Sequence, residues 1–113
     1  MKPKILICGT RKKGYQGIVI AKLCSVKKER DFEIIEGCCP NSADEYAEEY
    51  AKGENIKIYH YPAISGKYLT RNIEMVTACD EVIAFWDGFS YGTAQTIATA
   101  IKQHKPVTIV ELR

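Results

Sequence analysis

The sequence predicts an α/β fold: a single domain over residues 1–113 in which a parallel five-stranded sheet carries helices on both faces. Two observations predict this fold class. Short apolar runs rich in β-branched and aromatic residues alternate with segments in which apolar residues recur at helical spacing. No linker, low-complexity segment or solenoid repeat interrupts the alternation. Strict alternation of this kind is typical of parallel strands joined by crossover helices.

The first half of the chain contains two strand–loop–helix units. Residues 4–8 predict a strand, and the apolar positions within 18–23 predict the helix that follows. Residues 32–35 predict the second strand, and Asn41 or Ser42 can cap the next helix because their side chains accept bonds from free N–H groups. The apolar face of that helix contains Tyr46, Ala47, Tyr50 and Ala51.

The second half continues the alternation. Residues 56–59 predict the third strand and 68–76 a helix, while strands over 81–85 and 107–110 flank a helix over 91–104. Sheets of this class bind ligands outside the carboxyl ends of their strands, near the point where strand order reverses. The loops expected at that edge begin at Gly9, Gly37, Pro62 and Asp87.

Composition and charge exclude several classes of protein. The net charge of +2 is close to balance, so nucleic acid is not an expected partner. No window has the apolar length of a membrane span and no signal-peptide pattern follows Lys4, so we expect a cytoplasmic protein that does not bind membranes.

The cysteines point to a reducing compartment. Their number, five, is odd, and they are scattered through apolar segments, which is typical of free thiols rather than of a disulfide framework. No Cys-x-x-Cys pair occurs, and we expect neither a metal nor a cofactor. The residues that could in principle meet in space around a metal are Cys24, Cys38, Cys39, His60 and His104.

The segment from Asp80 to Thr93 is the most informative part of the chain. Its apolar run breaks into a turn flanked by Gly88 and Gly92, and a helical pattern follows. Glycines leave room for close approach of the backbone, and Ser90 or Thr93 can cap the helix. Unpaired N–H groups at the helix start would then point into the space above the strand, which is an anion-binding arrangement.

Side chains beside this turn leave several roles open. Asp87 can accept hydrogen bonds from ribose hydroxyls, or it can hold the turn through its own backbone. Phe89 lies in the loop and is a better candidate for base stacking than Phe85 or Trp86, which fit the core. No general base accompanies the serine and threonine hydroxyls at recognisable spacing, so nucleophilic catalysis is not indicated.

Two loops in the first half are further candidates for anion binding. At Gly9-Thr10-Arg11, backbone N–H groups and the Arg11 guanidinium could take a phosphate, although a tight turn with a solvated arginine fits equally well. Gly37 begins a turn that runs into a helix with Asp44 in its first turn. This pattern fits anion capture and ordinary helix capping alike.

Arg71 and Asn72 stand early in the third helix. A cation gains nothing from the helix dipole at that end, so its presence needs another reason, and a bound anion would supply one. The alternative is a surface arginine that pairs with Glu74.

Taken together, these motifs resemble the SLOG superfamily, and the resemblance covers nearly the full chain. Its small stand-alone members have a Gly-Gly-Ala-x-Gly-x-Asp turn, an Arg-Asn-x-x-Met helix start and an Ala-Phe-x-Gly-Gly-x-Gly-Thr turn around one pocket. The corresponding segments here are Gly9-Thr10-Arg11, Gly37 to Asp44, Pro62-Ala63 with Gly66-Lys67, Arg71-Asn72 with Met75, and Asp80 to Thr93.

The resemblance implies a Rossmann-like sheet and a nucleotide or nucleotide-derived ligand. The superfamily includes the Lonely Guy phosphoribohydrolases, the DNA-processing protein of natural transformation and nucleotide-sensing domains of antiphage systems. By position, it implies that Arg71 contacts the ligand's phosphate or sugar and that Gly9 to Arg11 close the pocket. It also implies a homo-oligomer, as is common among members. The residues that would hold phosphate are Gly88, Ser90, Gly92 and Thr93.

One departure from the superfamily bears on catalysis. Lonely Guy enzymes read Gly-Gly-x-Gly-Thr-x-x-Glu, and this glutamate acts beside an arginine in cleaving an N-glycosidic bond, whereas Thr96 stands at its position here. Nucleoside deoxyribosyltransferases, a related resemblance, also rely on a helix glutamate. Asp87 is the nearby carboxylate that could act with Arg71 as the catalytic pair. Our leading hypothesis is therefore a nucleotide-binding sensor or regulatory module, and the alternative is an N-glycosidase or phosphoribohydrolase of nucleoside monophosphates, or a deoxyribosyltransferase-like enzyme.

Overall fold

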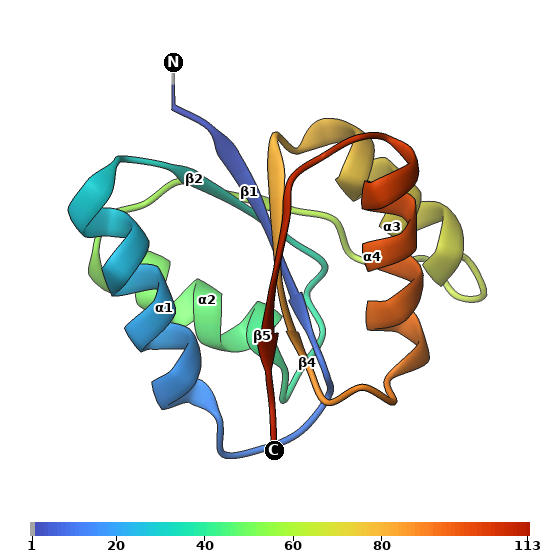
Figure 1. Ribbon diagram of the computed structural model, residues 1–113, viewed down its shortest axis with the longest axis horizontal. Helices are drawn as coiled ribbons and strands as arrows, with labels where there is room; N and C mark the ends of the chain where they lie inside the picture. Colours follow the sequence, from blue (N-terminus) through green and yellow to red (C-terminus); the bar gives the residue numbers. More distant parts are fainter. Residues whose placement is uncertain (1) are drawn as a thin grey trace.

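The computed structural model describes residues 2–113 and confirms the predicted fold class; residue 1 of the predicted domain lies outside the described residues. A parallel five-stranded sheet of order β3-β2-β1-β4-β5 lies between two layers of helices (Figure 1). The elements are β1 (Lys4–Gly9), α1 (Gln16–Glu29), β2 (Glu33–Glu36), α2 (Ala43–Gly53), β3 (Ile58–His60), α3 (Tyr68–Ala78), β4 (Glu81–Trp86), α4 (Tyr91–Lys102) and β5 (Val107–Glu111).

The central strands are apolar on both faces because both faces of the sheet are covered. In β1, Ile5, Leu6 and Ile7 are fully buried. Helices α1 and α2 pack over one face and α3 and α4 over the other, as Figure 1 shows, and each layer has its own apolar cluster. Side chains of a strand alternate between the two faces, so Ile5 and Ile7 belong to the first cluster and Leu6 to the second.

The strand order reverses between β1 and β4. From β1 the chain first builds outward to β2 and β3, and then returns to add β4 and β5 on the other side. Loops that follow β1 and β4 therefore diverge from a common point at the carboxyl edge, which is where doubly wound sheets bind ligands. No helix within residues 2–113 has the length and hydropathy that a membrane span requires.

Most element boundaries differ by one or two residues from the sequence expectation, and two of these differences have a clear cause in the backbone. The third strand was expected over 56–59 but spans Ile58–His60, since Asn55, at φ +56°, turns the chain after α2 and Ile56 is bonded back to Ala51. The last helix was expected to reach His104 but ends at Lys102. His104 has φ +58°, a left-handed conformation that stops a helix.

Candidate functional site

A cavity of about 400 Å³ opens at the carboxyl edge of the sheet, beside the point where strand order reverses. This volume lies within the range of about 300–1,000 Å³ that is typical of small-molecule sites. The cavity brings together these sequence-predicted residues: Gly9, Arg11, Asp44, Arg71, Asn72, Ser90, Gly92 and Thr93.

Four predicted residues, Thr10, Gly37, Asp87 and Gly88, do not line this cavity. Asp87 Oδ1 accepts hydrogen bonds from the backbone N–H groups of Phe89 (2.8 Å) and Ser90 (2.9 Å). Its own N–H donates to Thr10 Oγ1 at 3.2 Å, which joins the β4–α4 turn to the end of β1. Gly88 has φ +88°, where a side chain would be strained. These bonds hold the pKa of Asp87 below its usual range.

The start of α4 is open toward the cavity. Ser90 stands at the N-cap position, but its hydroxyl pairs with Thr93 Oγ1 at 3.2 Å, so the expectation that Ser90 or Thr93 caps the helix through its side chain is wrong. The first turn contains no acidic residue. The backbone N–H groups of that turn, from Tyr91 to Thr93, are therefore left for water or a ligand.

The start of α2 has the opposite character. Ser42 Oγ accepts from the Asp44 N–H, and the Tyr15 hydroxyl accepts from the Ala43 N–H at 2.8 Å. Asp44 Oδ2 accepts from the N–H groups of Gly37 and Cys39, both at 3.2 Å. Of the two interpretations of this loop, the contacts favour helix capping, because side chains of the protein itself, two from this loop and one from Tyr15, take the N–H groups that an anion would need.

Asp44 is buried behind this loop. Burial raises the pKa of its carboxyl, while the Cys39 N–H and the charge of Arg71 act in the opposite direction. Within residues 2–113, Asp44 is the one carboxylate on the cavity wall.

Arg71 is buried rather than exposed at the surface, and its nearest partners do not include Glu74. Its Nη1 donates to the carbonyls of Gly37 (2.6 Å) and Tyr61 (3.0 Å), and its Nε donates to Asn72 Oδ1 (2.9 Å). A Cβ on Gly37 would lie 2.6 Å from Nη1, so only glycine allows this approach. The Nη2 group, whose contact is the weak acceptor Cys39 Sγ at 3.8 Å, retains donors for a ligand.

Arg11 supplies a second cation at the mouth. It is exposed in the loop after β1, and the adjacent Lys12 N–H donates to the Asn41 carbonyl at 2.7 Å, which fixes this loop against the β2–α2 loop. Among the described residues Arg11 has no ion-pair partner. The cavity thus combines two guanidinium groups with the positive end of α4.

Several wall residues were given no ligand-binding role from the sequence, although Cys39, Ser42 and Met75 belong to the motifs quoted above: Cys8, Cys39, Ser42, Tyr68, Met75 and Thr96. Helical spacing could have found some of them. Tyr68 and Met75 lie three residues before and four after Arg71, and Thr96 lies four after Gly92, so each shares a helix face with an assigned residue. Thr96, at the position of the Lonely Guy glutamate, donates to the Gly92 carbonyl at 3.0 Å.

The solved structures that share this fold include two proteins that bind or carry molybdenum cofactor. The molybdenum cofactor binding protein from the phototrophic bacterium Rippkaea orientalis superposes with a TM-score of 0.75 at 19% identity. The match covers 96% of this chain and 76% of the other protein. The molybdenum cofactor carrier protein from Chlamydomonas reinhardtii gives 0.71 and 18%, with the same coverage. At this identity the likeness concerns the fold alone.

No curated protein matches the sequence significantly. The sequence model of the SLOG cluster4 family matches residues 2–113, which confirms the resemblance seen in the motifs. The chain belongs to the SLOG cluster4 family.

Proposed function

We propose that this protein binds a nucleotide or nucleotide-derived ligand at the carboxyl ends of its strands and acts as a sensor or regulatory module. One observation carries the proposal: Arg11, Arg71 and the open first turn of α4 surround a single cavity. An anion placed there would meet backbone N–H groups and two guanidinium groups at once. Phosphate is the anion that such an arrangement suits best.

The other part of the cavity wall suits the less polar part of such a ligand. Cys8, Tyr68 and Met75 contribute apolar surface close to the arginines. The Arg71 guanidinium lies over the Tyr68 ring, 5.8 Å from its centre, and the side chain of Tyr68 is still about half-exposed. A base or another planar group could stack on this ring while its phosphate lies at α4.

Binding is supported better than turnover. The catalytic alternative needs Asp87 and Arg71 as its pair, but the Asp87 carboxylate already accepts two N–H groups of its own turn and is not part of the cavity wall. Asp44, the carboxylate on the wall, is likewise bonded to its own loop. Neither carboxylate is free to act as an acid or base without first breaking these bonds.

Two further expectations complete the proposal. Leu69, Ile73 and Ile101 expose apolar surface on α3 and α4, which supports a homo-oligomer with this layer at the interface. Light scattering of the purified protein over a range of concentrations tests it, and a monomer throughout would contradict it.

All five cysteines are free, which supports our expectation of a reducing, cytoplasmic location.

Thermal unfolding with a panel of ligands tests the main proposal. The panel contains nucleoside mono-, di- and triphosphates, NAD, ADP-ribose, cyclic nucleotides and, because of the two structural neighbours, molybdenum cofactor. A ligand at a hundred times its dissociation constant stabilises the folded state by about 2.7 kcal/mol, which raises the midpoint by several degrees. We expect one class of phosphorylated ligand to give this shift.

Two variants locate the binding site. Arg11→Ala should abolish most of the shift, whereas Lys13→Ala, which removes an equal charge from the same loop but away from the cavity, should keep it. Equal shifts in both variants, or no shift with any compound, would contradict the proposal. Analysis of the same samples for free base distinguishes turnover: its release from a nucleoside monophosphate would establish the glycosidase alternative instead.

A further inference from the structure

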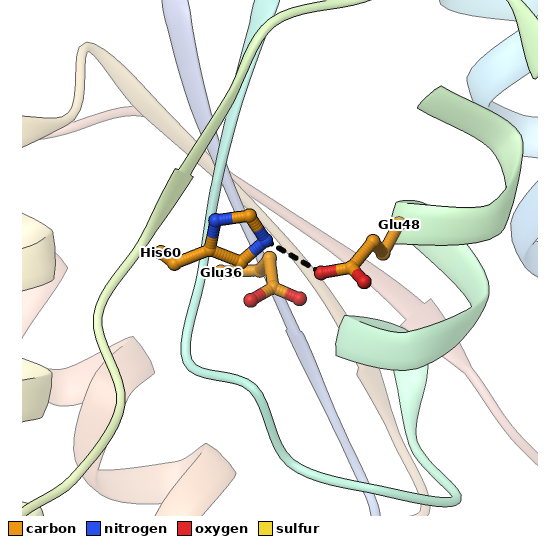
Figure 2. A group of neighbouring side chains, drawn as sticks. All are labelled: Glu36, Glu48 and His60. Carbon is orange, nitrogen blue, oxygen red and sulfur yellow. Dashed lines mark hydrogen bonds and ion pairs between the residues drawn. The ribbon is translucent and has the colours of Figure 1, made fainter. Parts of the chain in front are cut away.

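A second group of polar side chains lies outside the cavity, at the β3 edge of the sheet. Glu36 is the last residue of β2 and His60 the last of β3, and the two stand side by side in the strand register. Glu48 reaches them from α2. Figure 2 shows the three side chains converging from these separate elements, with His60 and Glu48 joined directly.

We propose that Glu36, Glu48 and His60 form a binding site for a divalent transition-metal ion, and that Zn²⁺ is the ion that suits it best. Each residue offers one ligand atom, and these three atoms lie within 4.8 Å of one another. Ligand atoms bound at about 2.0–2.2 Å from a tetrahedral ion lie about 3.3–3.6 Å apart. The observed spacing therefore needs only small side-chain rotations to match that geometry.

The hydrogen bond between His60 Nε2 and Glu48 Oε1, at 2.6 Å, holds the two outer ligands together and must open for an ion to enter. Both side chains are partly exposed, at 47% for His60 and 29% for Glu48, so both can rotate. Lys52 pairs with the other Glu48 oxygen at 3.2 Å, but this side chain is 72% exposed and leaves readily into solvent.

Glu36 supplies an independent reason for a cation. Only 1% of the surface of Glu36 is exposed, and its Oε1 accepts hydrogen bonds from the N–H and the thiol of Cys38. Its Oε2 takes no hydrogen bond from any residue within 2–113, and this oxygen keeps contact with solvent on the side that faces Glu48 and His60. A carboxylate that is almost fully buried and faces a second carboxylate is costly to keep ionised unless a positive charge compensates it. A bound ion at this position supplies that charge.

The ligand types select the metal. Two carboxylate oxygens and one imidazole nitrogen suit Zn²⁺ and related first-row ions, and a water molecule can complete the tetrahedron on the exposed side. Mg²⁺ and Ca²⁺ favour sites built from oxygen atoms and are expected to bind far more weakly here. The arrangement therefore predicts a preference for Zn²⁺ over Mg²⁺.

Titration of the chelator-treated, reduced protein with Zn²⁺, followed by calorimetry and by thermal unfolding, tests the site. We expect one ion per chain with a raised unfolding midpoint. His60→Gln and Glu48→Gln should each weaken binding at least tenfold while the fold, measured by circular dichroism, is kept. The matched controls are His104→Asn, which changes the other histidine to a residue tolerant of its left-handed backbone, and Glu49→Gln, an exposed neighbour on α2.

Co²⁺ distinguishes this site from binding by the free cysteines. We expect visible ligand-field absorption that is lost in His60→Gln, without the near-ultraviolet charge-transfer band of a cobalt–thiolate bond. Such a band, unchanged affinity in both ligand variants, or no binding at millimolar Zn²⁺ would each overturn the proposal. These outcomes are independent of the nucleotide proposal, because none of the three ligands lines the cavity.

Discussion

Two helix starts at the same edge of the sheet differ in how their backbone is satisfied. At α2, the side chains of Ser42, Asp44 and Tyr15 take the N–H groups of the helix start and of the loop before it. At α4, no side chain caps the helix and no acid lies in its first turn. Both follow a glycine-containing loop, yet within residues 2–113 the second leaves its first N–H groups without a side-chain partner, as the proposed anion site requires.

The difference shows which part of a glycine-rich pattern is informative. Glycine permits a loop to approach a ligand, but the side chains that follow decide whether the helix start is available. Asp44 and Glu45 place negative charge in the first turn of α2, where they offset the helix dipole. The corresponding turn of α4 reads Tyr91-Gly92-Thr93 and leaves the dipole uncompensated.

The largest effect is expected at Arg71, which touches both regions. Arg71→Ala leaves the carbonyls of Gly37 and Tyr61 without their charged donor, so we expect the free energy of unfolding to fall by about 2–3 kcal/mol. We also expect the variant to lose ligand binding. Urea denaturation measures the first and ligand-induced shifts the second. Arg11→Ala is the control, with binding reduced and stability unchanged. Wild-type stability in Arg71→Ala would show that the strand ends do not need this residue.

Gly92→Asp would make the start of α4 resemble that of α2. Nothing lies within 4 Å of a Cβ added at Gly92, so the side chain fits without strain. We expect the free protein to gain about 1 kcal/mol from the acid and from the loss of glycine, and the affinity for a phosphorylated ligand to fall at least tenfold. Gly92→Ala separates the two causes, because it should keep most of the stability gain with a smaller loss of affinity. Unchanged affinity in Gly92→Asp would place the phosphate elsewhere.

Serine-to-alanine changes at the two helix starts should have opposite consequences. Ser42→Ala removes a cap bond and should cost about 1 kcal/mol. Among the described residues the Ser90 hydroxyl bonds Thr93 alone, so we expect Ser90→Ala to change stability little and to weaken ligand binding. Chemical denaturation of both variants, with and without ligand, measures the contrast. Equal stability losses would remove the distinction between the two helices.

The smallest expected effect concerns the pH dependence of the β4–α4 turn. The N–H groups of Phe89 and Ser90 lower the pKa of Asp87, so its ionised form stabilises the folded state above the unfolded pKa of about 3.9. This contribution is lost as pH falls through the lowered value. Asp87→Asn should therefore be less stable than wild type at neutral pH, and the difference should vanish in strong acid. A difference that is constant with pH would exclude this role for the charge.

Local patterns in the sequence predicted the fold and much of the cavity wall. The alternation of strands and helices is a property of neighbouring residues, and so is the turn at residues 87–93. The burial of Arg71 could not be predicted this way, because its partners Gly37 and Tyr61 come from two other strand ends. The role of Tyr15 at the start of α2 depends on a contact across 28 positions of the chain, which no local pattern contains.

The dual bonding of Arg71 divides the cavity into parts that differ in their freedom to change. Substitution at position 71 alters the proposed ligand site and also removes hydrogen bonds to the ends of β2 and β3, so a change of ligand preference there also lowers stability. Arg11 and Tyr68 have exposed side chains that brace no strand end. New ligand preferences can therefore be engineered by exchanging residues at the mouth while the floor of the cavity stays as it is.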